Sequence, residues 1–139
     1  MIIKTEQNFN VSVPQLWKAI TDLTEMHNWY FKEIKAFKAE EGFTTEFLIQ
    51  NEGRNFTHVW KVLEVQENHK LVVEWTFKEY PGKGEVTFDL EETANGSKLK
   101  LSNTGLESFP SDIPEFKPES CQAGWNYFIN ESLNLYLNQ

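Results

Sequence analysis

The stretch that decides the fold is Val13-Pro14-Gln15-Leu16-Trp17-Lys18-Ala19-Ile20-Thr21, together with the segment that runs from Gly124-Trp125-Asn126-Tyr127-Phe128 to Leu137. Ser12 is a good helix N-cap, and Pro14 suits a first helical turn, where its missing N–H would have no partner. The C-terminal segment places apolar residues at helical spacing. The residues between the two stretches are strand-like and rich in Trp and Phe. This pattern predicts a curved sheet that wraps around one long helix and encloses an apolar hollow.

The middle of the chain indicates antiparallel strands. Residues 33–104 alternate between apolar and polar side chains, as strands with one buried face do. Asn95-Gly96 is a strong hairpin signal, and we expect further turns at Asn51-Glu52-Gly53 and Gly82-Lys83-Gly84. A change of parity after Val62 indicates a β-bulge. Residues 2–10 add an N-terminal strand, followed by two short helices, so we predict one α+β domain over residues 1–139 with about seven strands.

The last helix is predicted to start near Pro118 and to run for roughly five turns. At ordinary helical spacing its buried face would carry Cys121, Trp125, Phe128, Ser132 and Leu135, with Ile129, Leu133 and Tyr136 beside it. Cys121 is expected to be inert on this face, because a buried free Cys behaves as a small apolar residue.

The composition argues against several classes of function. The chain has 21 acidic and 13 basic residues, a formal net charge of −8. A nucleic acid or an anionic membrane would repel this charge, and the sequence has no Lys/Arg cluster to offset it. No apolar run approaches the ~20 residues of a membrane helix, and the N-terminus lacks signal-peptide features. The single cysteine allows no internal disulfide, so we expect a cytoplasmic protein.

Several motifs together resemble the START-like (SRPBCC) superfamily, and within it the branch related to the activator of Hsp90 ATPase (AHSA1-like). These motifs are Val-Pro-Gln-Leu-Trp-Lys-Ala-Ile-Thr-Asp at 13–22, Trp29-Tyr30, Leu-Val-Val-Glu-Trp at 71–75, Ser-Lys-Leu-Lys-Leu-Ser-Asn-Thr-Gly at 97–105, and Gly124-Trp125. The resemblance spans nearly the whole chain and implies the helix-grip fold with a cavity. It departs at Asn103, where the family often has His. It implies no single activity, because the superfamily includes lipid carriers, hormone receptors, cyclases and co-chaperones, some of them stress-related.

No set of residues in the sequence identifies a reaction. The histidines His27, His58 and His69 lie in no metal-spaced motif, so we predict no catalytic residue, no metal and no cofactor. His27 and His69 are expected to be exposed. His58 shares the parity of Trp60 and is expected to point inward. There it could be a hydrogen-bonded core residue, a ligand contact, or the acid–base group of a small-molecule hydrolase or cyclase.

The aromatic residues carry the functional prediction. There are 11 Phe and 5 Trp, more than a thin core between one sheet and one helix needs. They could pack only as core, or some could line the hollow with a few inward polar groups, such as Thr45, His58, Asn103 and Ser132. The ligand-binding residues that we predict are Trp29, Phe47, His58, Trp60, Trp75, Phe77, Phe88, Asn103, Trp125 and Phe128.

The predicted ligand is a small apolar or amphipathic molecule, held between the sheet and the C-terminal helix by a monomer or weak dimer. The alternative is a co-chaperone-like module whose partner is a chaperone. In both cases we expect no nucleic-acid and no membrane partner.

Overall fold

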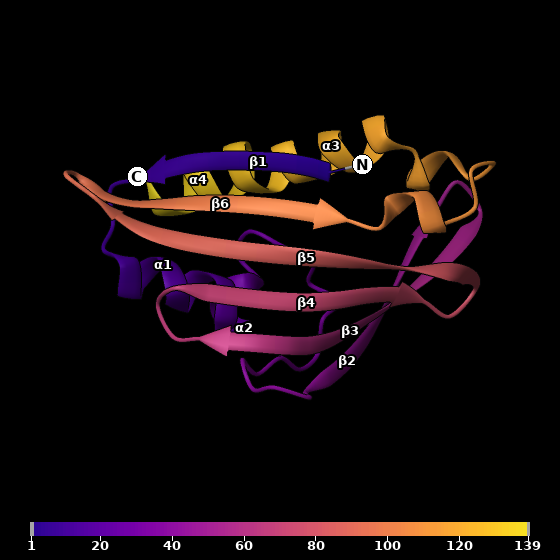
Figure 1. The fold of residues 1–139 in the computed structure, drawn as a ribbon, viewed down its shortest axis with the longest axis horizontal. Coiled ribbons are helices and arrows are strands. Elements are labelled where there is room, and N and C mark those ends of the chain that lie inside the picture. Colours follow the sequence, from indigo (N-terminus) through magenta and orange to yellow (C-terminus); the bar gives the residue numbers. More distant parts are fainter. Residues whose placement is uncertain (1, 139) are drawn as a thin grey trace.

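Six strands form one antiparallel sheet in the computed structural model, which describes residues 2–138. The strands are β1 (Ile2–Phe9), β2 (Thr44–Asn51), β3 (Arg54–Gln66), β4 (Lys70–Phe77), β5 (Tyr80–Thr93) and β6 (Gly96–Thr104). Their order is β1-β6-β5-β4-β3-β2, so β2 to β6 form a meander and β1 adds to its far edge. The α+β helix-grip prediction is therefore confirmed. Figure 1 shows the sheet curving in front of the helices.

The expected count of about seven strands is one too high for the described residues. The segment from residue 33 to residue 41 forms no strand. Ile34 and Phe37 are instead buried, and the Phe37 ring packs edge-on against Phe43 and Trp60. The segment is therefore a connection between α2 and β2. Its apolar residues are buried in the core, and none of them belongs to a strand.

Three of the four local signals in the meander are confirmed. Glu52 and Gly53, both with positive φ, join β2 to β3. Asn95 precedes Gly96 in the β5–β6 hairpin, and the register of β3 shifts after Val62 as a bulge requires.

The expected turn at Gly82-Lys83-Gly84 is wrong. The chain reverses at Lys78-Glu79, and the two glycines lie within β5, where the register with β4 shifts. Gly82 has a φ of 120°, and a Cβ at this position would lie 2.5 Å from Cδ1 of Phe109. The irregularity thus makes room for Phe109 against the end of the sheet.

The first helices begin as the sequence predicts. Helix α1 (Val13–Thr21) has a capping box in which the Gln15 N–H donates to Ser12 Oγ and the Ser12 N–H donates to Gln15 Oε1. Helix α2 (Leu23–Met26) follows directly, with Asp22 as its N-cap. The inner face of α1 buries Leu16 and Ile20, which attaches it to the concave side of the sheet.

The C-terminal segment is helical but irregular. Helix α3 (Pro118–Trp125) continues into the π-helical η3 (Asn126–Leu133) and then into α4 (Asn134–Leu137). Figure 1 shows this segment lying along β1. Two short 3-10 helices, η1 (Leu106–Ser108) and η2 (Pro114–Phe116), lead into it from β6. Within residues 2–138, no helix has the length and apolar character needed to cross a bilayer.

The π-helical stretch corrects the predicted buried face. Its i→i+5 hydrogen bonds widen the turns, so the fully buried residues fall at a spacing of four: Trp125, Ile129 and Leu133. Leu135, which ordinary helical spacing places on the buried face, is 76% exposed. Ser132 does face inward, but its hydroxyl donates to the Trp29 carbonyl at 2.7 Å and so serves the packing of the helix.

Candidate ligand cavity

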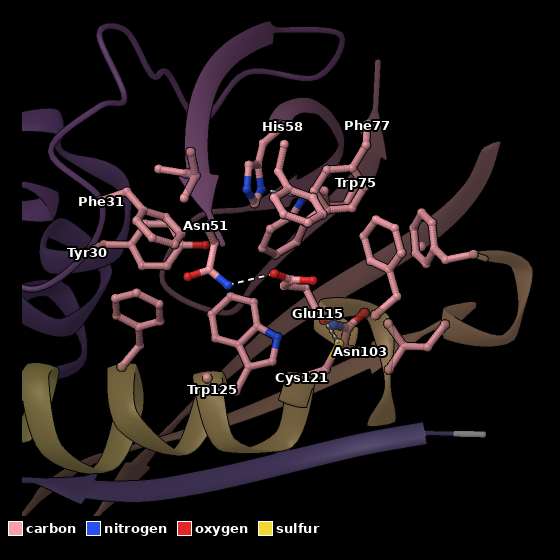
Figure 2. Close-up of a pocket in the computed structure, with 18 of the residues that line it drawn as sticks. Tyr30, Phe31, Asn51, His58, Trp75, Phe77, Asn103, Glu115, Cys121 and Trp125 are labelled. Atoms are coloured by element: carbon pink, nitrogen blue, oxygen red, sulfur yellow. Dashed lines mark hydrogen bonds between the residues drawn. The ribbon is translucent and has the colours of Figure 1, made fainter. Parts of the chain in front are cut away.

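A cavity of about 310 Å³ lies between the concave face of the sheet, η2 and the C-terminal helix. Figure 2 shows its side chains converging from the loop after α2, from the central strands and from α3. Nine of the 19 lining residues carry aromatic rings: Tyr30, Phe31, Phe56, Trp75, Phe77, Phe109, Phe116, Trp125 and Phe128. The remaining lining is Ile49, Gln50, Asn51, His58, Gly84, Asn103, Leu106, Glu115, Cys121 and Gly124.

The structure brings six of the ten predicted ligand-binding residues to the cavity wall. They are His58, Trp75, Phe77, Asn103, Trp125 and Phe128. Thr45, named as a further inward polar group, is buried but lies outside the wall. The six lie on β3, β4 and β6 or on the C-terminal helical segment.

The other four predicted residues are buried behind the wall. They are Trp29, Phe47, Trp60 and Phe88. Phe47 stacks on the His58 ring at 4.6 Å, and Trp60 packs edge-on against Trp75 at 5.3 Å. Trp29 donates its indole N–H to the Ala19 carbonyl at 2.8 Å. These residues support the wall, because an inward parity does not distinguish a ring at the cavity surface from a ring one layer deeper.

Several wall residues come from segments without sequence periodicity. Tyr30 and Phe31 lie in the loop after α2, while Phe109 and Phe116 lie in the proline-containing stretch between β6 and α3. The signal that could have found them is their composition, because large apolar residues in an irregular segment must be buried against something. Their partners become visible only in the folded chain.

His58 is held as a neutral, hydrogen-bonded ring. Its Nδ1 accepts the indole N–H of Trp75 at 2.9 Å, so the ring proton lies on Nε2. Burial lowers the pKa of His58 to about 3, although the negative charge of Glu79 acts in the opposite direction. A ring with this pKa is a poor proton acceptor at neutral pH.

Tyr30 contributes a polar atom without a partner. Its side chain is only 6% exposed, and its hydroxyl makes no hydrogen bond within the described part of the chain. Burial raises the pKa of this phenol well above its ordinary value, so the hydroxyl stays protonated. The hydroxyl has less than 1 Å² of accessible surface, so it lies among the packed rings, and Figure 2 shows Tyr30 beside Phe31 at the wall. An unpartnered buried hydroxyl costs free energy in the folded chain.

Two further polar side chains reach the wall. Asn103 is buried on β6 and lines the cavity. Cys121 is half-buried, and burial raises the pKa of its thiol to about 11, so the thiol is un-ionised and a weak nucleophile. That the cysteine is inert stays a prediction, and the residue lies at the cavity rather than inside the core.

A polar cluster borders the mouth of the cavity. The Arg54 guanidinium donates two hydrogen bonds of 2.9 Å to Glu115, and Asn51 Nδ2 donates to the same carboxylate at 2.6 Å. These bonds from Arg54 hold the pKa of Glu115 below its usual value. The cluster connects the β2–β3 hairpin to η2, and Figure 2 shows the Asn51–Glu115 bond as a dashed line. We name Asn51, Arg54 and Glu115 the mouth cluster.

The remaining histidines lie away from the cavity. His27 Nε2 lies 2.6 Å from the Ile34 carbonyl and is partly buried, so the expectation of an exposed residue is wrong for His27, because this contact attaches the loop after α2. His69 is exposed in the β3–β4 turn, as expected. Within residues 2–138, no group of three or more His, Cys, Asp or Glu side chains is placed to hold a metal ion. The geometry of the site is that of an apolar binding cavity with a few neutral polar groups.

A curved sheet that grips a C-terminal helix around such a cavity defines the class as a START-like, helix-grip protein. The family model described as activator of Hsp90 ATPase homolog 1-like protein (AHSA1) matches residues 10–138, so the chain belongs to this family. A comparison with curated proteins found no match.

Several solved structures share this fold. Protein CV1439 from Chromobacterium violaceum is 20% identical, with 99% of this chain and 97% of that chain covered and a TM-score of 0.79. Protein Mll3558 from Rhizobium loti is 14% identical, with 99% and 96% covered and a TM-score of 0.82. The Aha1 dimer from Colwellia psychrerythraea is 15% identical, with 99% and 96% covered and a TM-score of 0.72. At these identities the likeness concerns the fold alone.

Proposed function

We propose that this chain binds a small hydrophobic or amphipathic molecule in the cavity between the sheet and the C-terminal helix. The observation that carries the proposal is the aromatic-lined void of about 310 Å³. An apolar cavity of roughly 150 Å³ is enough to hold benzene, so this one has room for a larger molecule. Apolar walls with a few placed polar groups are typical of small-molecule sites.

Trp75 and Trp125 make the proposal testable by fluorescence, because both indoles line the cavity. The amphipathic fluorescent probe 1-anilinonaphthalene-8-sulfonate should quench their emission when its rings enter the cavity. Its charged sulfonate would then lie at the mouth, so its binding depends on both regions. Uncharged naphthalene serves as the second probe. Either ligand should raise the melting temperature by mass action, by about 2.7 kcal/mol of stability at 100 times its Kd.

Gly124 offers a variant that blocks the site and spares the fold. Gly124 lines the cavity, and a Cβ added there would meet no atom within 4 Å. Gly124→Leu should therefore abolish probe binding while the melting temperature of the free protein stays the same or rises, since Gly is a poor helix former. The control is Ala123→Leu on the exposed face of the same helix. If Gly124→Leu binds both probes as tightly as the unmodified chain does, the cavity is not the site.

Family membership supports a second candidate, a co-chaperone-like interaction module. The description of the matching family names the activator of Hsp90 ATPase. In this role the chain would use its outer surface to contact an Hsp90-type chaperone. The discriminating measurement is stimulation of the ATPase activity of such a chaperone by the Gly124→Leu variant. Stimulation equal to that of the unmodified chain favours the interaction module, and its absence in both proteins leaves ligand binding as the better account.

A further inference from the structure

We propose that Asn103 determines the specificity of the cavity, and that it selects an uncharged ligand with an N–H donor beside a C=O acceptor, as a primary carboxamide or a lactam has. This inference rests on the proposed function and names the ligand class for the same cavity. It depends on the burial of Asn103, on the hydrogen bonding of its side-chain amide, and on the charge of the lining.

The first step is the position of Asn103 on the sheet. Strand β6 alternates, and its buried side carries Ser97, Leu99, Leu101 and Asn103. Asn103 is the last of the four, is 5% exposed and lines the cavity. Figure 2 shows it among the side chains that surround the cavity. The strand therefore carries a primary amide to the wall of an otherwise largely apolar space.

The second step concerns the partners of this amide. Ser97, the other polar residue on the buried side of β6, donates its hydroxyl to the Val11 carbonyl at 2.8 Å. The Asn103 side chain makes no hydrogen bond within the described part of the chain. Its amide atoms are not completely enclosed either, because the enclosed unpaired atoms among residues 2–138 are Tyr30 Oη and Trp60 Nε1. The unpaired amide of Asn103 thus keeps accessible surface, and the cavity is what this residue lines.

The third step locates the amide oxygen. Gly84 lines the same cavity, and a Cβ added to it would lie 3.6 Å from Asn103 Oδ1 and 3.4 Å from Cε2 of Phe109. A side chain at residue 84 would therefore crowd this oxygen, whereas glycine leaves it open to a ligand.

The chemistry of the ligand follows from the amide itself. A primary amide offers two N–H donors and one carbonyl acceptor. A ligand with an N–H beside a C=O can pair with the acceptor and with one donor of Asn103 at the same time. An ester or a ketone can pair only with the donor. A hydrocarbon would leave both sides of the amide buried without a partner, which is unfavourable.

Charge disfavours ions in the same space. Among the described lining residues Glu115 is the charged one, and its carboxylate already accepts three hydrogen bonds from Arg54 and Asn51. An ionised ligand beside Asn103 would lose its hydration and find only a neutral amide in exchange. The ligand class is therefore uncharged.

The experiment compares cyclohexanecarboxamide with methyl cyclohexanecarboxylate by isothermal titration calorimetry. The two molecules share a ring and a carbonyl, but the ester has no N–H. The ratio of amide affinity to ester affinity is measured in the unmodified chain and in Asn103→Leu, so that the hydration of each free ligand cancels. We expect this ratio to fall about three- to tenfold in Asn103→Leu, the effect of one net hydrogen bond. The cyclohexanecarboxylate anion should bind the unmodified chain at least tenfold more weakly than the amide.

Asn103→Leu keeps the branched shape of the side chain and removes a polar group that has no partner in the folded chain. The melting temperature of the free variant should therefore stay the same or rise. A large decrease would show that the amide holds the fold and would overturn the assignment. The control is Asn8→Leu, the same change on the exposed side of β1, which should leave the affinity ratio unchanged.

The outcomes separate this inference from the proposed function. If the ratio is the same in Asn103→Leu, if the anion binds more tightly than the amide, or if naphthalene binds but neither cyclohexane ligand does, the ligand class is wrong and the cavity still binds. If neither cyclohexane ligand nor naphthalene binds, the proposed function fails. If the ligands bind Gly124→Leu as tightly as the unmodified chain, binding occurs outside the cavity and both proposals fail.

Discussion

His58 should make the stability of this protein depend on pH below neutrality. The perturbation is acidification from pH 7 to pH 4.5, applied to the unmodified chain and to His58→Phe. In the folded chain the pKa of His58 is lowered by burial to about 3, against 6.5 as its ordinary value. Below this ordinary value of 6.5, the unfolded chain therefore binds a proton that the folded chain excludes.

The magnitude follows from the two pKa values. Above pH 6.5 the imidazole is neutral in both states and contributes no pH dependence. As the pH falls from 6.5 towards 3, the free energy of unfolding should decrease by about 1.4 kcal/mol per pH unit because of this residue. At pH 4.5, about two units below the ordinary value, the loss should be roughly 2.7 kcal/mol.

Urea unfolding at a series of pH values provides the measurement. His58→Phe keeps a ring beside Phe47 but cannot titrate, so from pH 7 to pH 4.5 the unfolding free energy of the unmodified chain should fall by about 2.5 kcal/mol relative to that of the variant. Other groups titrate in both proteins and cancel in this difference. His69→Gln is the control, because this exposed side chain stays in water in either state. A difference that stays constant within about 0.5 kcal/mol, the usual limit of additivity, would show that His58 is not held neutral by burial.

Three further predictions concern the core, the mouth and the outer surface. Trp125→Ala should lower the free energy of unfolding, measured with urea, by about 3–5 kcal/mol, because the ring is buried between α3 and the sheet. A decrease below about 1 kcal/mol would mean that the helix does not pack as described. Arg54→Ala breaks the mouth cluster and should accelerate naphthalene release in stopped-flow measurements. Lys78→Ala removes the exposed pair with Glu46 and should leave the release rate unchanged. Equal release rates for Arg54→Ala and the unmodified chain would show that the cluster does not limit access. With a net charge of −8, the chain should show no binding to DNA or to anionic vesicles at about 150 mM salt, and micromolar binding that weakens as salt rises would contradict this.

The elements of this fold were predictable because their signals are local. The Ser12–Gln15 capping box needs only residues three apart, and Asn95-Gly96 specifies a tight hairpin from its own backbone preferences. The inward position of His58 follows from strand alternation alone. These features depend on the geometry of a few consecutive residues, which the sequence contains in full.

The candidate cavity was predictable only in part, for a physical reason. Parity places Trp60 and Trp75 on the same inner face, yet only Trp75 reaches the wall, because the depth of a ring depends on what packs against it from other elements. The π-helical turn that exposes Leu135 likewise depends on how the C-terminal segment fits the sheet.

The unpaired Tyr30 hydroxyl and the mouth cluster are the clearest cases. Tyr30 comes from an irregular loop, and its hydroxyl lacks a partner only because of the rings that enclose it. The mouth cluster likewise joins Arg54 to Glu115 across 61 residues of sequence. The sequence by itself determined the strands, the capped helix and the inner face of the sheet, through short-range sterics and hydrogen bonding. The tertiary structure alone decided which inner side chains line a void and which buried polar atoms stay unpaired, because both depend on contacts between segments that are distant in the chain.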